Sequence, residues 1–196
     1  MNEPNGNDEI CEEVKPHRVP EFEVDPIFLN RWSPRAFLPE PIPEETLMRV
    51  FETAKWAPSS YNEQPWRFIL ARTETDRAVF VDFLMEANQA WAKAAPVLIL
   101  IVSKKTFSRN GNPNSVNQFD AGTAWGYMAL GATQNNLITH GMAGFDAEKA
   151  REVLGVPGDF DILAVIALGK RAGAAPEEIS GRRALNETIM EGKFSS

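Results

Sequence analysis

The sequence predicts an α+β domain in three layers, with helices covering both faces of a central sheet. Three apolar runs of strand length, at residues 66–71, 97–102 and 162–168, alternate with segments whose apolar residues recur at helical spacing. The chain has 196 residues, 43% of them hydrophobic, which is enough for one domain with a buried core. We therefore expect a single α-β-α sandwich, and the spacing alone leaves the strand directions open.

The N-terminal end of the chain is polar and lacks periodicity. Residues 1–20 are rich in Glu, Asn, Pro and Lys, so we expect a flexible leader followed by one domain over residues 21–196. The single cysteine, Cys11, excludes an internal disulfide and a paired-cysteine metal site. The two histidines do not cluster with it, so we expect no metal site.

Charge and hydropathy exclude several classes of partner. A net charge of −7 argues against a general nucleic-acid or anionic-membrane binder, since both partners require a basic face. The longest apolar run, residues 96–102, is far too short to span a bilayer, and the first residues lack the pattern of a secretory signal. We expect a cytoplasmic protein that binds neither nucleic acid nor membrane.

In the first half of the chain, prolines mark the element boundaries. Helical spacing begins after Pro43, with acidic residues in the first turn where they complement the helix dipole, and Pro58 ends it. Residues 66–71 fit a strand. Residues 76–94 place their apolar side chains on one helical face, so we expect one helix there, which Pro96 stops.

In the second half, a continuous apolar run at residues 97–102 predicts a central strand, and residues 103–118 predict an irregular loop. Residues 120–140 predict a long helix closed by Gly141. Glycine inside a helix costs roughly 1 kcal/mol against alanine, so close approach to another helix or a cofactor would explain the small residues there. These are Ala121, Gly122, Ala124, Gly126, Ala129, Gly131 and Ala132.

The last elements are short. Asp146 is suited to cap a helix that ends at Gly155, because its side chain can accept from a free backbone N–H. Residues 162–168 predict another buried strand, and the tail from Arg182 is polar. No internal repeat is present.

Two stretches carry polar groups suited to an anionic, planar ligand. In residues 31–35 a proline favours extended backbone, so Arg31, Ser33 and Arg35 alternate and can point to one side as a phosphate clamp. Residues 57–66 hold Ser, Asn and Gln side chains in a loop stiffened by two prolines. Taken alone, each stretch also fits an ordinary surface turn.

Two later stretches add glycines and cations. Residues 140–146 contain two glycines that would let backbone N–H groups approach a planar ligand closely. Residues 169–171 and 181–183 are basic clusters that fit either an anion site or a solvated surface. Neither a P-loop nor a GxGxxG motif is present, which excludes the usual nucleotide-binding loops.

Together, in this order and spacing, the four stretches resemble the nitroreductase family. The segment Arg31-Trp32-Ser33-Pro34-Arg35 matches the family's opening Arg-x-Ser-x-Arg/Lys, and residues 58–66 match its Pro-Ser-Ser-x-Asn-x-Gln-Pro-Trp throughout. Residues 144–146 match a Gly-Phe-Asp turn of the family, and Arg182 with Arg183 match its late cations. The resemblance covers about residues 22–189.

The resemblance implies a nitroreductase-like sandwich with a central mixed sheet, in an intertwined homodimer that holds FMN at the subunit interface. It implies that Arg31 and Ser33 hold the FMN phosphate, and it does not distinguish Arg182 from Arg183 as the third phosphate ligand. Arg35 would reach the N1/O2 edge of the flavin, where a positive charge stabilises the reduced form. The backbone N–H of Gly144 would face flavin N5.

Other residues complete the implied cofactor site. Ser59, Ser60 and Asn62 would come from the partner subunit, and Asn88 or Gln89 would touch the pyrimidine ring. Ala143 stands where many relatives carry Glu, which leaves the choice of substrate open. The full set expected around FMN is Arg31, Trp32, Ser33, Arg35, Pro58, Ser59, Ser60, Asn62, Gln64, Asn88, Ala143, Gly144, Arg182 and Arg183.

The implied activity is a ping-pong transfer of hydride from NADH or NADPH, through flavin N5, to an electrophile such as a nitroaromatic or a quinone. The flavin carries this chemistry, so we expect no catalytic acid or base from the protein. The alternatives are a different flavin reaction on the same fold (a dehydrogenase or a flavin-fragmenting enzyme), a flavin-binding protein without turnover, and an interaction domain without FMN.

Overall fold

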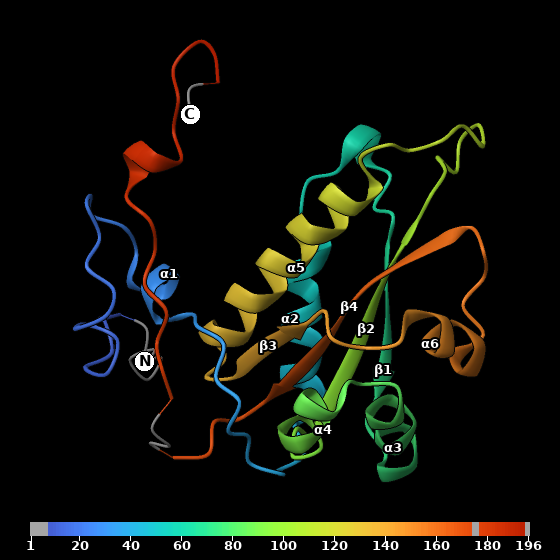
Figure 1. The fold of residues 1–196 in the computed structure, drawn as a ribbon, viewed down its shortest axis with the longest axis horizontal. Coiled ribbons are helices and arrows are strands. Elements are labelled where there is room, and N and C mark those ends of the chain that lie inside the picture. Colours follow the sequence, from blue (N-terminus) through green and yellow to red (C-terminus); the bar gives the residue numbers. More distant parts are fainter. Residues whose placement is uncertain (1–7, 174–176, 195–196) are drawn as a thin grey trace.

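A four-stranded sheet forms the centre of the protein in the computed structural model, which describes residues 8–173 and 177–194 (Figure 1). The strands are β1 (Trp66–Ala71), β2 (Val97–Lys104), β3 (Ile138–Met142) and β4 (Phe160–Gly169), in the order β1-β2-β4-β3. Every pairing is antiparallel, so the expected mixed sheet is wrong for the described strands. The physical reason is the insertion of β4 between β2 and β3, which run in the same direction but do not pair.

Helices cover both faces of this sheet, which confirms the three-layer architecture (Figure 1). On one face lie α2 (Glu44–Lys55) and α5 (Asn117–Gln134). On the other face lie α3 (Glu74–Asp82), α4 (Glu86–Ala92) and α6 (Ala147–Leu154). The side chains of β2 alternate between the two cores, with Val97, Ile99 and Ile101 in one and Leu98, Leu100 and Val102 in the other.

The small residues of α5 divide between two sides. A Cβ at Gly131 would lie 2.7 Å from Cγ2 of Thr53 in α2, so the two helices approach too closely there for a side chain. A Cβ at Gly122 or Gly126 would meet no atom within 4 Å. These two glycines instead lie on an open face of α5 beside exposed Phe119 and Tyr127.

The expected single helix over residues 76–94 is two helices. The chain breaks between Asp82 and Glu86 because Leu84 forms an isolated bridge with Phe145 in the turn after β3. Asp146 N–H donates to the Phe83 carbonyl at 2.8 Å, which completes the pairing. Tertiary hydrogen bonding therefore outweighs the helical periodicity at this point.

The expected helix over residues 120–140 is also wrong at its C-terminal end. The helix ends at Gln134, and Asn136 takes a left-handed conformation with φ 56°, a role that asparagine fills when no glycine is present. Leu137 N–H donates back to the Ala132 carbonyl at 2.9 Å. Residues 138–142 then form the edge strand β3, so Gly141 lies in a strand and does not close a helix.

The other elements follow the expected local signals. Asp146 accepts from Lys149 N–H at the start of α6, and Gly155 ends that helix with φ 64°. Short helical segments lie outside the sandwich: α1 (Pro26–Asn30), η1 (Ser60–Asn62) and η2 (Leu185–Glu187). Within the described ranges, no helix has the length and apolar character needed to cross a membrane.

The N-terminal segment differs from the expected flexible leader. Residues 1–7 lie outside the described residues, but residues 8–20 pack onto the domain. Val14 is 1% exposed and forms a small core with Trp32 and Ile179, which we call the terminal core. The two ends of the chain therefore build one structure beside α1, because each supplies an apolar side chain that the other covers (Figure 1).

Candidate functional site

The extended segment after α1 carries the first group of expected site residues. Arg31 caps α1, and its Nη1 atom lies 3.5 Å from Oγ of Ser33. The Ser33 carbonyl oxygen lies 2.8 Å from Nδ1 of His140 in β3, so the segment is fixed against the sheet edge. Arg35 is exposed, and its backbone N–H donates to the Glu177 carboxylate at 2.6 Å.

The Trp32 side chain does not join this group. It is 7% exposed and belongs to the terminal core with Val14 and Ile179. The guanidinium of Arg171 lies 4.7 Å from the centre of its ring, a favourable cation–π distance. Val14, Ile179 and Arg171 cover the Trp32 ring. Only the backbone of Trp32 can therefore line a site formed by Arg31 and Ser33.

The turn after β3 brings Gly144 next to α4. Two donors converge on the Gly144 carbonyl: Met85 N–H at 3.0 Å and Asn88 Nδ2 at 2.9 Å. A Cβ at Gly144 would lie 2.8 Å from Asn88 Nδ2, so glycine is required for this approach. No residue in the described parts of the chain accepts from the Gly144 N–H, and Ala143 beside it is exposed.

Contacts of His140 connect this turn to the arginine segment. The rings of His140 and Trp91 lie 4.6 Å apart, which joins β3 to the helix that carries Asn88. Burial lowers the pKa of His140, although the Ser33 and Pro34 carbonyls at Nδ1 act in the opposite direction. The structure thus gathers Ser33, Asn88 and Gly144 around one end of β3.

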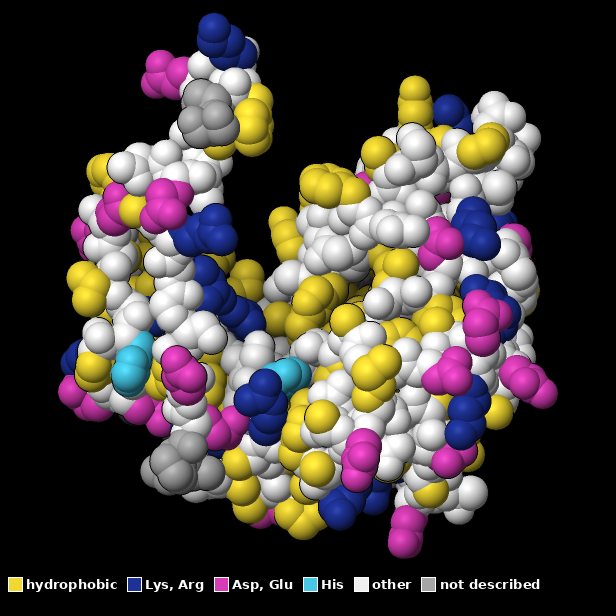
Figure 2. All heavy atoms as spheres, viewed as in Figure 1, with side chains coloured by type: hydrophobic (Ala, Val, Ile, Leu, Met, Phe, Trp, Pro, Cys, Tyr) yellow, Lys and Arg dark blue, Asp and Glu magenta, His cyan; other side chains and the backbone are white. Residues whose placement is uncertain are grey.

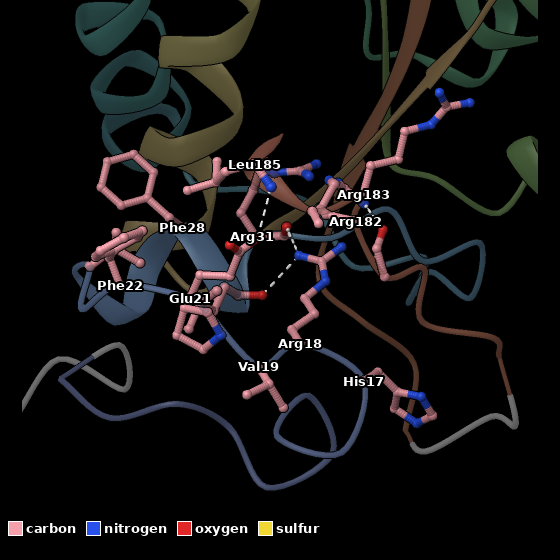
Figure 3. Close-up of a pocket in the computed structure, with 15 residues that line it drawn as sticks. His17, Arg18, Val19, Glu21, Phe22, Phe28, Arg31, Arg182, Arg183 and Leu185 are labelled. Atoms are coloured by element: carbon pink, nitrogen blue, oxygen red, sulfur yellow. Dashed lines mark hydrogen bonds between the residues drawn. The ribbon is translucent and has the colours of Figure 1, made fainter. Parts of the chain in front are cut away.

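A cavity of about 630 Å³ lies between residues 17–31 and residues 181–185 (Figure 3). We call it the arginine cavity because its walls hold four arginines, whereas Glu21 is the one carboxylate among the residues that line it. Glu21 is engaged, since its Oε1 accepts from Leu185 N–H at 2.8 Å. Figure 2 shows the groove beside this region, with Lys and Arg side chains along one wall. The four arginines are Arg18, Arg31, Arg182 and Arg183.

The positive charges in the arginine cavity repel one another. The pKa of Arg18 falls to about 10, mainly because of burial and also because Arg182 and Arg31 lie nearby. Burial and Arg182 lower the pKa of Arg31 as well. Among the described residues, none of these guanidiniums forms an ion pair with a carboxylate. A phosphate group would relieve this repulsion, so the cavity fits a phosphorylated ligand.

The second expected stretch lies at the N-terminal end of α5. The backbone N–H of Ser60 donates to Oδ2 of Asp120 at 3.0 Å, at the first turn of α5, whereas α1 packs beside the later turns (Figure 1). None of residues 58–64 is among those that line the arginine cavity. One chain therefore does not bring this stretch to the arginine cavity. The residues concerned are Pro58, Ser59, Ser60, Asn62 and Gln64.

The loop after Pro58 is held in an unusual backbone conformation. Tyr61, Asn62 and Gln64 have φ values of 52°, 57° and 50°, in the left-handed region that costs non-glycine residues about 1–2 kcal/mol each. Gln64 N–H donates to Oγ of Ser59 at 3.0 Å, and Gln64 Nε2 donates to the Asn62 carbonyl at 2.9 Å. The loop is thus preformed, as a binding loop would be.

The connection between β2 and α5 supports this loop from outside. The guanidinium of Arg109 lies 3.9 Å from the centre of the Tyr61 ring, and Ser108 N–H donates to the Glu63 carboxylate at 2.9 Å. Phe107 meets the Tyr61 ring edge to face at 5.7 Å. The expected irregular loop over residues 103–118 is therefore packed against the left-handed backbone at Tyr61.

Sequence reasoning missed two residues of these sites. Arg18 lies in the expected leader, where no periodicity indicates a packed residue, and its partners are backbone carbonyls that carry no sequence signal. Asp120 is buried and holds the Ser60 backbone, although the sequence offers only an acid in the first turn of a helix. Both depend on contacts between segments distant in the sequence.

Comparisons with known proteins give a consistent result. The sequence model of the nitroreductase family matches residues 29–90 and 76–170. A solved structure described as an oxidoreductase containing FMN is similar over 100% of this chain and 99% of its own, with 38% sequence identity and a TM-score of 0.85. An NADH dehydrogenase of Thermus thermophilus is 27% identical over 184 aligned residues, covering 77% of this chain and 88% of that protein.

A further structural likeness concerns the fold alone. A nitroreductase family protein of Streptococcus pneumoniae superimposes with a TM-score of 0.71 at 20% sequence identity. The match covers 82% of this chain and 96% of that protein. The three-layer arrangement is therefore shared with proteins whose sequences have diverged widely.

Proposed function

Since this chain belongs to the nitroreductase family, we propose that it is an FMN-dependent oxidoreductase that transfers hydride from NADH or NADPH to an electrophilic acceptor. One observation carries the proposal: the segment that begins at Arg31 borders a cavity with four arginines, and it is bonded through Ser33 to β3, the strand that leads to the Gly144 turn. The Gly144 N–H meets no acceptor in the described ranges. The phosphate and the ring of a flavin mononucleotide need these two kinds of group.

FMN fits the residues that are present. The uncompensated charge of the arginine cavity suits its phosphate, with Arg31 and Ser33 as ligands and Arg182 or Arg183 beside them. Asn88 and Ala143 flank the Gly144 turn and would lie along the ring. The exposed Arg35 guanidinium is available for the pyrimidine edge of the flavin.

Bound FMN would supply the redox chemistry by taking hydride at N5 and passing it to a second substrate in a ping-pong cycle. The chain's own groups bind and orient. Arg35 places positive charge where the reduced ring is negative, and Gly144 offers a backbone donor to N5. A nitroaromatic or a quinone is the acceptor class that such a reaction serves.

We extend the proposal to a homodimer with two shared sites. The Ser59–Gln64 loop lies at the first turn of α5 and contributes no residue to the arginine cavity of its own chain, so it would line the flavin of a partner subunit. The open face of α5, with Phe119, Gly122, Gly126 and Tyr127, is an apolar surface suited to a partner helix.

The test begins with purified, full-length protein. We expect a yellow protein with one FMN per chain, which NADH or NADPH reduces once and which turns over continuously when a quinone or nitroaromatic is added. Protein that binds no flavin would rule out the proposal. Bound FMN that NADH and NADPH both leave oxidised would indicate a passive flavin carrier, and reduction without transfer to these acceptors would indicate a different flavin reaction.

A further inference from the structure

Arg18 is a buried arginine of the N-terminal segment whose charge no described carboxylate neutralises. It is 9% exposed, and all its described partners are backbone carbonyls. A buried cation normally has an anionic partner, because desolvation of an isolated charge is costly. The position of Arg18 in the wall of the arginine cavity indicates where that partner would lie.

We propose that Arg18 is a phosphate-binding residue, contributed to the cofactor site of this chain by its N-terminal segment. The inference rests on the proposed FMN function and adds a ligand to it. It assigns a role to a segment outside the matched family region, which begins at residue 29.

The orientation of the Arg18 guanidinium is fixed by three carbonyl groups. Its Nη1 atom donates to the carbonyls of Leu29 at 2.9 Å and Arg31 at 2.7 Å (Figure 3). Its Nε atom donates to the Ser180 carbonyl at 3.1 Å. Arg18 thereby joins the end of α1, which carries Arg31, to the segment that carries Arg182 and Arg183.

One edge of the guanidinium stays available to a ligand. The two N–H groups of Nη2 donate to no residue in the described ranges, and Arg18 lines the cavity. Each of these N–H groups can donate to a phosphate oxygen, and the positive charge of the guanidinium strengthens such a bond. The carbonyl contacts hold this edge in place, so little side-chain entropy would be lost on binding.

The backbone of Arg18 is held as firmly as its side chain. Arg18 N–H donates to the Val14 carbonyl at 3.0 Å, and Val14 is anchored in the terminal core with Trp32 and Ile179. Burial is the main cause of the lowered pKa of Arg18, and the nearby charges of Arg182 and Arg31 add to it, so a bound phosphate would offset both costs.

A direct role in phosphate binding differs from a purely structural brace in one measurable respect. Riboflavin has the flavin ring but no phosphate. Loss of a phosphate ligand weakens FMN and leaves riboflavin unchanged, whereas loss of a brace that shapes the whole site weakens both. The ratio of the two dissociation constants therefore separates an effect at the phosphate from an effect on the whole site. Arg18→Lys then tests the contact itself, because lysine keeps the charge for the phosphate but loses the carbonyl bonds of the planar guanidinium.

The experiment measures both dissociation constants by flavin fluorescence titration on the full chain. For Arg18→Gln we expect FMN binding to weaken about 10- to 100-fold, as for a lost charge-assisted hydrogen bond, with riboflavin binding within about twofold of the unsubstituted protein. Arg18→Lys keeps the charge without the planar fork and is expected to show a smaller loss in the same direction. It serves as the second variant if Arg18→Gln does not fold.

Arg151→Gln is the matched control, because Arg151 also donates to three backbone carbonyls, those of Val156, Pro157 and Phe160, far from the cavity. It should leave both dissociation constants unchanged. Equal loss of FMN and riboflavin binding in the Arg18 variants, or no loss of either, would overturn the inference while the flavoprotein assignment stands. Absence of FMN binding in the unsubstituted protein would overturn both.

Discussion

Nδ1 of His140 lies 2.8 Å from the carbonyl oxygen of Ser33, and this contact ties the edge strand β3 to the segment that carries Arg31 and Arg35. The ring is half-buried against Trp91. This contact therefore fixes the position of the arginine segment relative to β3, and Gly144 lies two residues beyond the end of that strand.

The first prediction concerns pH. Because burial lowers the pKa of His140 in the folded state, the unfolded chain binds more protons just below the ordinary histidine pKa of about 6.5. The free energy of unfolding should then rise with pH through that window and level off above it. His140→Gln should flatten this rise in urea titrations between about pH 5 and pH 8. The exposed His17→Gln is the control, and an unaltered rise in His140→Gln would contradict the role of His140.

A second prediction concerns Gly144→Ala. The added Cβ would lie 2.8 Å from Asn88 Nδ2, so the bond from Asn88 to the Gly144 carbonyl should break at a cost of about 1 kcal/mol. FMN affinity should fall as the turn moves, which titration would show. Gly158→Ala is the control, because a Cβ there meets nothing within 4 Å. Equal behaviour of the two variants would refute the close approach at Gly144.

A third prediction concerns the left-handed loop. Asp120→Ala removes the acceptor of Ser60 N–H, so the loop should open more often and the free energy of unfolding should fall by about 1–3 kcal/mol. Hydrogen exchange in residues 58–64 should rise selectively. Asp120→Asn retains an acceptor oxygen and should recover most of the protection. If exchange in the loop is the same in all three proteins, Asp120 does not hold it.

A fourth prediction tests the shared site. Gly126→Arg places a charge on the open face of α5, where a Cβ meets nothing within 4 Å of the single chain. We expect monomers by light scattering and loss of FMN, because the Ser59–Gln64 loop of a partner would no longer reach the flavin. Val153→Arg introduces the same charge at an exposed apolar residue of α6, and it should leave the dimer and its bound flavin intact. A monomeric Gly126→Arg protein with full FMN content would exclude a shared site.

A fifth prediction concerns Arg35→Gln. Loss of the positive charge should weaken FMN about tenfold and make its reduction potential more negative, because the anionic reduced ring loses a stabilising partner. Titration and spectroelectrochemistry measure the two effects. Arg49→Gln on α2, where Arg49 pairs only with Glu45 among the described residues, should change neither quantity. An unchanged potential in Arg35→Gln would remove Arg35 from the flavin edge.

Local signals predicted most of the sandwich. The strands β1, β2 and β4 appear where apolar runs indicated them, and Asp146 and Gly155 bound α6 as their capping preferences require. The same signals failed where a distant segment competes. Residues 83–85 have helical periodicity, yet they pair with the Gly144 turn.

Patterns along the chain were sufficient for the three-layer class and for the elements whose signals span a few residues. Three placements required the tertiary structure: Arg18 lies in one cavity wall with Arg31 and Arg182, His140 lies in a strand beside Ser33, and the Ser59–Gln64 loop lies at the first turn of α5, outside that cavity. The reason is that periodicity and capping act within one or two turns, whereas these placements depend on backbone carbonyls and apolar contacts between segments that folding alone brings together.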